Sequence, residues 1–561
     1  MLEKDRETVA TGATVRPWTG RSAVLLLCVL MVCTVIIVRG IKTGEFSYNV
    51  DEAQHAVTGL YAAGLLHDHP AHPVDYTYKF YAQYPAVSVI HWPPLFYGFE
   101  GLSFLLLGPG VVAARLTILA FALLGLSAWF EMVRELQDEW TAALATALLA
   151  LLPALLLFEK TVMLEIPCLS LCLAASLCWT KYLLHEKNAP LIWFVGFASA
   201  ALLTKQNSVY LALFCLGSAI AMGRSGLLFK PAALWSGLSV ALIAGPYYFL
   251  VYRAHWKITV MGLADKGSSG TSSWLFYWGA LPGQLGWMLL ALSLLGLATS
   301  PRWDRRKITL VMLSWIGACC VTFSLIGLKE ARYALYWLPP FTYFAAGMLT
   351  RLFTRQPLRA IASVAAVVLV ASSVGVAWSY HRPYVSGYSA AAKAVTQAAP
   401  GGIVLYDGEL PGNFIFFVSV NDPHRHFLVL RKALYAYRID KSWGSEELVH
   451  GREDIEDLLR RDGVRFVVVS DRMNLTFEVQ RTLREMLQSE QFKLRGSFPI
   501  FSTEQPQGSN LLLYENKLWA PPADKFLRIR MLTLDHDLVV PFSQFELVGD
   551  AEHPPQGAGA K

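Results

Sequence analysis

The pattern of apolar and polar positions along the chain predicts a polytopic membrane protein. Apolar runs of about 20 residues, the length that an α-helix needs to cross a bilayer, recur from near the N-terminus to residue 378. Polar connections separate these runs, and many of them are short. We expect about eleven transmembrane helices, at residues 22–39, 111–133, 140–157, 165–183, 190–204, 207–222, 231–251, 274–297, 308–327, 334–350 and 360–378.

The basic residues of the connections predict the orientation in the membrane. In an eleven-helix arrangement they collect on one side, together with the N-terminal residues 1–21, and an excess of Lys and Arg marks the cytoplasmic side. The connection after the first helix, about residues 40–110, therefore faces outward. The residues on the basic side are Lys4, Arg6, Arg16, Arg21, Lys181, Lys187, Arg224, Lys230, Arg302, Arg305, Arg306, Lys307, Arg351, Arg355 and Arg359.

The long outer loop is expected to contain two helices. Residues 49–66 place apolar side chains on one helical face and Asp51 and His55 on another, which is typical of an amphipathic helix at the membrane interface. Residues 93–107 form a second apolar stretch. It is too short to span the bilayer and carries Glu100, so we expect a helix lying on the membrane.

After about Ser379 the pattern changes to that of a soluble α/β domain outside the membrane. The runs "GIVLYDG", "NFIFFVSV" and "VRFVVVSD" are rich in Val, Ile and Phe, as β-strands are, and they are interleaved with charged helical stretches at 445–461 and 475–489. The expected organisation is a cytoplasmic N-terminus at 1–21, a membrane domain at 22–379 that includes the loop 40–110, and an extracytoplasmic α/β domain at 380–561.

Composition and charge agree with this fold class. The 561 residues are 54% hydrophobic and 16% charged, with a mean hydropathy of +0.39, outside the usual range of soluble domains. The net charge of +6 comes from the orienting connections, so nucleic acid is not an expected partner. The eight cysteines lie in apolar segments and are expected to be small core side chains. The first apolar run lacks a small-x-small cleavage site, which indicates a retained helix.

Asp51 and Glu52 form an acidic pair at the start of the first outer helix. One interpretation is structural: Asn49 caps the helix, Glu52 closes a capping box, and acids in a first turn favour the helix dipole. The other interpretation is catalytic, because carboxylates that converge from separate outer loops can act as a general base and as a cation ligand.

A second acid, Glu165, stands in "EKTVMLEIP" at the outer end of the fourth predicted span. Pro167 and an acid are both favoured in a first helical turn, which supplies a structural explanation. Glu165 can also meet the first-loop acids, since loops far apart in the sequence can converge on one face of a membrane protein.

Basic residues also occur on the outer connections, where the positive-inside rule predicts few cations. Lipid head groups are one explanation for them. A phosphate-bearing substrate is the other, because Lys and Arg bind phosphate oxygens through charge-assisted hydrogen bonds. These residues are His91 in "HWPPL", Lys160, Lys205 in "LLTKQNS", Arg253 and Lys257 in "YRAHWK", and Lys329 and Arg332 in "LKEARY".

Five motifs together resemble a known family. They are "VDEAQHAVTG", "HWPPLFYGFEGLSFLLLG", "VMLEIP", "LLTKQNS" and "ARYALYWLPP". Their order and approximate spacing over residues 20–350 are similar to those of the GT-C glycosyltransferases that use polyprenyl-phosphate sugars. The bacterial branch of the dolichyl-phosphate-mannose protein mannosyltransferase-like family, which includes the lipid A aminoarabinose transferases, is the most similar group.

The resemblance implies roles for the acids. Asp51 matches the acid of the family's first outer loop, taken as the catalytic base or as an acceptor-orienting carboxylate, and Glu52 adjoins it. Glu165 matches the second-loop acid, which is Asp in many members. A divalent cation, if one is used, would bind at Asp51 and Glu165.

The resemblance also implies contacts with the substrate. Lys205 and Arg332 match basic positions near the donor phosphate, and Tyr333 follows Arg332 as in relatives. His91 takes the position before the Pro pair where relatives often have Lys or another polar residue. The expected substrate-binding residues are His55, His91, Lys160, Lys205, Arg253, Lys257, Lys329, Arg332 and Tyr333.

The expected function is transfer of a sugar from a polyprenyl-phosphate donor to a glycolipid, a cell-wall glycan or a protein, at the outer face of a bacterial inner membrane. The anomeric carbon is inverted, with Asp51 as the base. A transporter or flippase of lipid-linked glycans is one alternative, although it would place ionisable residues near the bilayer midplane. A non-catalytic membrane scaffold is another. The sequence leaves the sugar, the acceptor and the prenyl carrier open.

Overall fold

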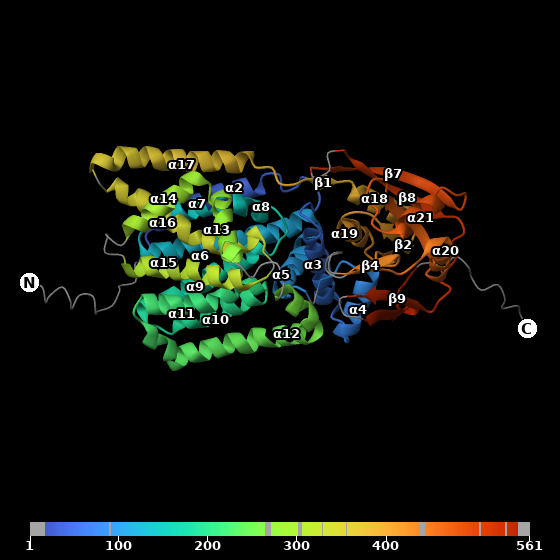
Figure 1. The fold of residues 1–561 in the computed structure, drawn as a ribbon, viewed down its shortest axis with the longest axis horizontal. Helices are drawn as coiled ribbons and strands as arrows, with labels where there is room; N and C mark the ends of the chain where they lie inside the picture. The colour runs from blue at the N-terminus through green and yellow to red at the C-terminus, as the bar shows by residue number, and fades with distance from the viewer. Residues whose placement is uncertain are drawn as a thin grey trace, which may run out of the picture. The chain divides into compact units, whose positions relative to one another are not determined.

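The computed structural model describes most of the chain as two compact units, and each is considered by itself (Figure 1). Unit 1 comprises residues 1–41, 90–96 and 115–382, and unit 2 comprises 42–89, 97–114 and 383–561. The described residues are 17–88, 91–263, 271–300, 306–327, 329–354, 356–437, 444–503, 507–532 and 536–547, without the side chains of 254–263 and 271–273.

Unit 1 is helical, and Figure 1 shows its long helices running alongside one another. Long apolar runs become helices because every backbone polar group must be satisfied within the segment when lipid surrounds it. The elements are α2 (Gly20–Val38), α6 (Val111–Leu136), α7 (Glu139–Ala150), α8 (Pro153–Glu159), α9 (Glu165–His185), α10 (Ala189–Leu202), η1 (Gln206–Val209), α11 (Tyr210–Ala221), η2 (Ser225–Phe229), α12 (Pro231–Leu263), α13 (Thr271–Leu285), α14 (Trp287–Thr299), α15 (Arg306–Leu325), η4 (Ala331–Trp337), α16 (Leu338–Phe353), η5 (Gln356–Leu358) and α17 (Arg359–Ser379).

All eleven predicted segments coincide with helices or helix pairs, but their lengths differ. Among the described residues, six helices are long and apolar enough to cross a membrane, or eight if two bent pairs each form one span. The pair α7 and α8 bends by 69° at Pro153, and the pair that ends in α14 bends by 115° at Gly286, whose φ is +76°. The helices α10, α11 and α16 are shorter than a full span. The total of eleven spans stays a prediction.

The helix α9 lies at the centre of unit 1. Of its most apolar window, 89% is buried, against 22% for α2 and 17% for α17. Its buried side chains include Cys168, Cys172 and Cys178, which pack as small apolar residues as expected. Most of α9 is therefore surrounded by protein.

Unit 2 joins the outer loop to the C-terminal residues. Its helices are α3 (Asp51–Asp68), α4 (Pro73–Gln83), α5 (Leu95–Leu107, of which residues 97–107 belong to this unit), α18 (Tyr388–Ala398), α19 (Pro411–Asn421), α20 (Gly451–Arg461), α21 (Glu478–Met486) and η7 (Phe542–Gln544). Its strands are β1 (Val385–Ser386), β2 (Gly402–Asp407), β3 (Phe427–Leu430), β4 (Tyr435–Tyr437), β5 (Ser445–Glu447), β6 (Val464–Ser470), β7 (Phe492–Ser502), β8 (Ser509–Asn516), β9 (Phe526–Met531) and β10 (His536–Pro541).

A six-stranded sheet organises unit 2. Its order is β1-β7-β8-β6-β2-β3, with β2 parallel to both β3 and β6 and the remaining pairs antiparallel. Every residue of β2 is buried, as expected for a strand covered on both faces. Ile403 and Leu405 face a core shared with α20 and α21, whereas Tyr406 stacks on Phe414 of α19. The predicted α/β character of this region is confirmed.

Specific hydrogen bonds hold the outer loop to the C-terminal residues. The carboxylate of Glu45 accepts from the backbone N–H groups of Tyr388 and Ser389, at 3.1 and 3.0 Å, and so stabilises the N-terminal end of α18. The amide of Asn413 exchanges hydrogen bonds with the backbone of Phe46, at 3.1 and 2.7 Å. The loop therefore shares the compact unit of the C-terminal residues.

One predicted strand is wrong. The run "NFIFFVSV" lies in the helix α19 instead of a strand. Pro411 occupies the first turn of this helix, and Leu410 before it has a left-handed φ of +41°, so the chain turns sharply after β2. A short apolar run that is buried all round has no periodicity to separate helix from strand.

The helix α3 forms as predicted but does not leave its polar face in water. His55 and Thr58 are buried together with the apolar residues of the helix, and Gly412 of α19 lies so close that a Cβ there would come within 2.8 Å of Ala53. Other parts of unit 2 cover this polar face, for example Tyr97 at His55, and the position of α3 at the membrane interface stays a prediction. In contrast, α5 leaves Phe99 and Leu106 exposed, and its place on the membrane stays a prediction.

Candidate functional site

The N-terminal end of α9 holds a buried ion pair. Glu165 is the first residue of α9, where the helix dipole favours an acid. Lys205, which precedes η1, places its Nζ 2.6 Å from Glu165 Oε1, and both side chains are 2% exposed or less. Glu165 Oε2 has no hydrogen-bond partner in the described part of the chain. Since buried polar atoms normally have partners, this oxygen keeps the capacity to accept one.

Arg332 and Tyr333, in η4, join this ion pair. The Nε of Arg332 lies 3.6 Å from Glu165 Oε1, and its Nη2 donates to Glu330 Oε1 at 3.2 Å. The side chain of Glu330 is 35% exposed, whereas that of Arg332 is 11% exposed. Tyr333 donates to Glu330 at 3.3 Å, and burial together with the charge of Glu330 raises the pKa of this phenol well above its usual range. Arg332 thus connects a buried acid to one that water reaches.

Two aromatic rings flank the lysine. Lys205 Nζ lies 5.2 Å from the ring centroid of Trp92 and 5.9 Å from that of Tyr333, within the range of cation–π attraction. A backbone hydrogen bond of 2.9 Å from Leu95 to Leu203 ties the segment of Trp92 to the end of α10. His91 is exposed and meets Trp92 edge-on, with 4.7 Å between the ring centroids. The residue beside Lys205 is therefore Trp92, which the sequence analysis had not selected although it stands in "HWPPL".

The other predicted cations of unit 1 have different surroundings. Lys329 donates to the backbone carbonyls of Phe323 and Ser324, at 3.0 and 2.8 Å, and so caps the end of α15. Lys160 is buried beside the end of α8, and Arg253 is exposed on α12. The side chain of Lys257 lies outside the described residues. Of the predicted basic residues, the structure groups Lys205 and Arg332 around Glu165.

Asp51 and Glu52, the acidic pair of unit 2, lie in two different environments. Glu52 is fully buried, and its Oε2 accepts the backbone N–H groups of Ser47 and Tyr48, at 2.8 Å each, which holds the loop before α3. Asp51 is half-buried, and its backbone N–H donates to Asn49 Oδ1 at 2.7 Å. The expected capping box is wrong: Val50 is the residue that caps the helix, it makes no side-chain cap hydrogen bond, and the Glu52 carboxylate bonds the preceding loop instead.

A buried acid that the sequence analysis had not selected lies next to this pair. Glu100 of α5 is fully buried against Gly59, and neither of its carboxyl oxygens has a hydrogen-bond partner among the described residues. Burial, and secondarily the charge of Glu52, raises the pKa of Glu100 well above its usual range. Close by on the same two helices, His55 Nδ1 pairs with the hydroxyl of Tyr97 at 2.8 Å.

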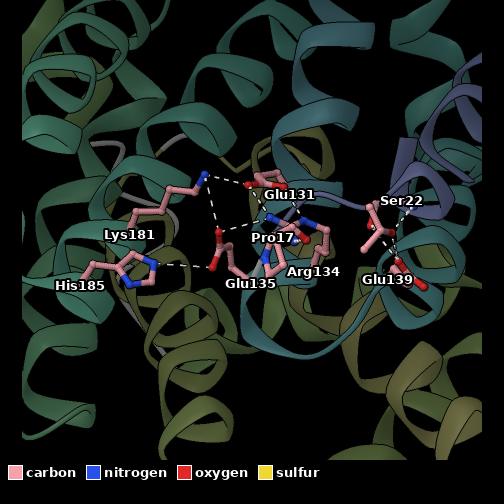
Figure 2. Close-up of polar contacts among 9 residues, drawn as sticks. Pro17, Ser22, Glu131, Arg134, Glu135, Glu139, Lys181 and His185 are labelled. Atoms are coloured by element: carbon pink, nitrogen blue, oxygen red, sulfur yellow. Dashed lines mark hydrogen bonds and ion pairs between the residues drawn. The ribbon is translucent and has the colours of Figure 1, made fainter. Parts of the chain in front are cut away.

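The opposite end of α9 holds a second charged cluster (Figure 2). Lys181 and His185 of α9 point toward Glu131 and Glu135 of α6, and Arg134 lies between the two acids. Lys181 Nζ is 2.7 Å and Arg134 Nε 2.8 Å from Glu131. Each charge here has an opposite charge beside it, which is typical of a structural ion-pair network.

The side chains around Glu165 do not fit a divalent cation. Within the described residues, no group of three or more His, Cys, Asp or Glu side chains is arranged to hold a metal ion, and the Glu165 carboxylate holds the ammonium of Lys205. Mg²⁺ and Ca²⁺ bind to several oxygen ligands, whereas the nearest neighbours here are nitrogen cations.

Comparison with known proteins is consistent with this geometry. Residues 91–248, which include Glu165 and Lys205, match the sequence model of the dolichyl-phosphate-mannose-protein mannosyltransferase family. The structure is similar to ArnT from Cupriavidus metallidurans bound to undecaprenyl phosphate, with a TM-score of 0.56 and 13% identity over 87% of this chain and 97% of that chain. The apo form of ArnT gives 0.57 and 13%, over 88% and 98%.

A more distant likeness is to the archaeal oligosaccharyltransferase AglB from Archaeoglobus fulgidus, in complex with an inhibitory peptide and a dolichol-phosphate. The TM-score is 0.51 and the identity 13%, over 79% of this chain and 69% of that chain. No curated protein matches the sequence.

The fold and the helical membrane segments define the class: this chain is an integral membrane protein with the fold of the GT-C glycosyltransferases. Within that class, residues 91–248 are similar to the dolichyl-phosphate-mannose-protein mannosyltransferase family, the group that the five motifs had indicated.

Proposed function

We propose that this protein transfers a sugar from a polyprenyl-phosphate donor to an acceptor nucleophile at the outer face of a bacterial inner membrane. The N-terminus is cytoplasmic and the C-terminal α/β residues are extracytoplasmic in this proposal. Undecaprenyl phosphate in ArnT and dolichol-phosphate in AglB support the choice of donor. The Glu165, Lys205 and Arg332 cluster of unit 1 is the observation that carries it.

This cluster can bind a phosphate because Lys205 and Arg332 are held in place and a ligand can displace Glu330 from Arg332. Lys205 is anchored by Glu165, and Arg332 is shared between Glu165 and the more exposed Glu330. An incoming phosphate can take the place of Glu330 on Arg332 without leaving a buried charge unpaired. Charge-assisted hydrogen bonds from Arg and Lys to phosphate are about twice as strong as neutral ones.

The reaction follows from these groups. The acceptor hydroxyl or amine attacks the anomeric carbon, and the bond from that carbon to the phosphate oxygen breaks. The electron pair leaves with the prenyl phosphate, whose developing charge Lys205 and Arg332 stabilise. The acceptor proton passes to the carboxylate of Asp51, and the configuration at the anomeric carbon inverts. The good leaving group makes a nucleotide-binding loop unnecessary.

The decisive experiment is the Asp51→Asn variant of the full-length protein in lipid vesicles. Loss of the base should lower transfer from the polyprenyl-phosphate sugar by about a hundredfold or more, since general bases contribute roughly 10²–10⁴. Asp75→Asn is the matched control, because Asp75 is an exposed acid of the same outer loop. If Asp51→Asn is expressed and inserted normally and transfers sugar at the wild-type rate, the assignment of Asp51 as the base is wrong. That result would favour a transporter or a scaffold.

The donor can be identified independently of activity. Purification with endogenous lipid, followed by mass spectrometry, should recover a prenyl-phosphate sugar from the wild type. The Lys205→Met/Glu165→Gln variant removes both charges of the buried pair and should retain much less of this lipid. Equal recovery from both proteins would argue against the phosphate role of the cluster.

A further inference from the structure

A cavity of about 620 Å³ lies within unit 2, well inside the size range of small-ligand sites. Gly408 and Glu409, which follow β2, line it from one strand, and Met473 and Asn474, which follow β6, line it from the next. Because β2 and β6 are parallel, these segments are the carboxyl ends of neighbouring strands. The cavity therefore lies at one edge of the parallel part of the sheet.

This edge is a topological switch point. From β2 the chain crosses through α19 to β3 on one side, and β6 lies on the other side of β2. The connections after β2 and after β6 thus diverge, which opens a crevice between them. In open α/β sheets, ligands bind in such a crevice outside the carboxyl ends of the strands.

Tyrosines dominate the lining of the cavity. Tyr388, Tyr406, Tyr435 and Tyr437 contribute aromatic rings, and Arg431 contributes a guanidinium that donates to the hydroxyl of Tyr437 at 2.8 Å. Rings of this kind combine an apolar face with a polar tip. A sugar ring has the complementary surface, with C–H groups on its faces and hydroxyls around its rim.

Hydrogen bonds to neighbouring residues hold two of the tyrosines, Tyr406 and Tyr435, in place. The hydroxyl of Tyr435 donates to the buried carboxylate of Asp407 at 3.0 Å, and Gln480 and Arg484 bond the same carboxylate at 2.8 and 2.6 Å. Tyr406 donates to the carbonyl of Glu409 at 2.6 Å. A preorganised aromatic wall loses little side-chain entropy when a ligand binds.

The cavity also reaches the residue next to the acid that the proposed function makes the base. Val50 lines it, and Asp51 is the next residue and opens α3. A ligand held by the tyrosines would therefore extend toward Asp51 within the same unit. The ionic groups at the cavity do not favour an anion, because the side chain of Glu409 stands in the lining as well as that of Arg431.

We propose that this cavity binds the glycan portion of the acceptor and presents its nucleophilic hydroxyl or amine near Asp51. The inference rests on the proposed function, and it narrows the acceptor from lipid, glycan or protein to a glycan-bearing molecule. The tyrosine rings hold the sugar faces, and Arg431, Glu409 and Asn474 bond the hydroxyls around the rim.

The test measures glycan binding without a donor. Saturation-transfer NMR on the full-length protein in detergent would use maltotriose, mannotriose and triacetylchitotriose as probes, with inorganic phosphate and a neutral hexapeptide as competitors. At least one oligosaccharide should bind, and Tyr437→Ala should weaken it by about tenfold, or roughly 1.4 kcal/mol. Tyr437→Phe, which keeps the ring, should stay within about threefold.

Tyr78→Ala is the matched control, because Tyr78 is an exposed tyrosine of α4 outside the cavity. Binding of no oligosaccharide, an unchanged affinity in Tyr437→Ala, or binding of the hexapeptide alone would each overturn the proposal. In a transfer assay, Tyr437→Ala should raise the acceptor KM and leave the donor KM unchanged. Glycan binding needs no turnover, so it can hold even if Asp51→Asn retains activity and the proposed reaction fails.

Discussion

The two ends of α9 carry similar charges in different settings. Glu165 and Lys181 lie roughly 24 Å apart at 1.5 Å per residue, and each meets an opposite charge. At the Lys181 end, Glu131 is bonded by both a lysine and an arginine. At the Glu165 end, one carboxylate oxygen lacks a partner among the described residues, and Arg332 is shared with a half-exposed acid.

The comparison teaches that an ion pair indicates a binding site only where one of its charged side chains can exchange its partner for a ligand. Buried pairs are weak contributors to stability, because the desolvation of two charges offsets most of their attraction. At the Lys181 end, the charged side chains neutralise one another, so no ligand is needed there. The Glu165 end retains an arginine whose partner can be exchanged, which is what a transient anionic ligand requires.

The largest expected difference concerns the two lysines. Lys205→Met should lower transfer by about a hundredfold or more, since the leaving phosphate loses a cation. Lys181→Met should leave transfer unchanged and lower the melting temperature by a few degrees at most, because this lysine is 31% exposed. Turnover and thermal unfolding of both variants check the difference.

A control separates chemistry from stability at Lys205. Removing Lys205 alone leaves the buried Glu165 with only the more distant Arg332, at 3.6 Å, as a cation, and breaking a buried ion pair costs about 3–5 kcal/mol. The Lys205→Met/Glu165→Gln variant should recover much of this stability and still lack transfer. Recovery of transfer in the double variant would mean that the lysine serves only the fold.

Arg332 should show the next largest effect. Arg332→Ala should raise the apparent donor KM by about tenfold or more, because hydrogen bonds to charged groups contribute roughly 1.5–3 kcal/mol. Arg134→Lys is the comparison at the other end of α9; it weakens the forked bonds to Glu131 and should lower the melting temperature without changing the donor KM. An unchanged donor KM in Arg332→Ala would contradict its phosphate role.

Glu330 should give a smaller change in the opposite direction. It holds Arg332 in the absence of donor, so Glu330→Gln should lower the apparent donor KM by about threefold. Steady-state kinetics over a series of donor concentrations measures this. A raised KM would indicate that Glu330 positions Arg332 for the donor instead of competing with it.

The smallest effect concerns Glu100, a buried acid whose carboxyl oxygens have no hydrogen-bond partner among the described residues. Its raised pKa means that the native state holds its proton more tightly than the unfolded state does. This stabilisation is complete below the ordinary pKa of Glu and is lost as the pH rises through the raised native pKa. The melting temperature should fall between about pH 5 and about pH 9, and Glu100→Gln should reduce this fall. Identical profiles for both proteins would contradict the assignment.

Local patterns predicted much of the fold. The apolar runs place the helices of unit 1 because hydropathy and length are local properties. "GIVLYDG" and "VRFVVVSD" form β2 and β6, since Val-rich runs fit a buried parallel sheet. "NFIFFVSV" shows the limit, because the turn at Leu410 and Pro411 decides for a helix where the side-chain pattern does not.

The candidate site was predictable only as a set of residue types. Glu165, Lys205 and Arg332 were selected from their positions on outer connections, and the structure brings these three together. Lys329 had the same signal but caps α15, and Glu100 stood out in the sequence only as a charge within an apolar stretch, before burial set it apart. Charge and spacing do not say which partner a side chain will find.

The sequence by itself therefore determined the membrane class, the helical segments and the acids that begin α3 and α9, because each depends on neighbours within a few turns. Only the tertiary structure decided that Lys205 pairs with an acid 40 residues away, and that four tyrosines meet where β2 and β6 end. Packing brings distant segments together, and the burial that follows gives a charge or a ring its chemical role.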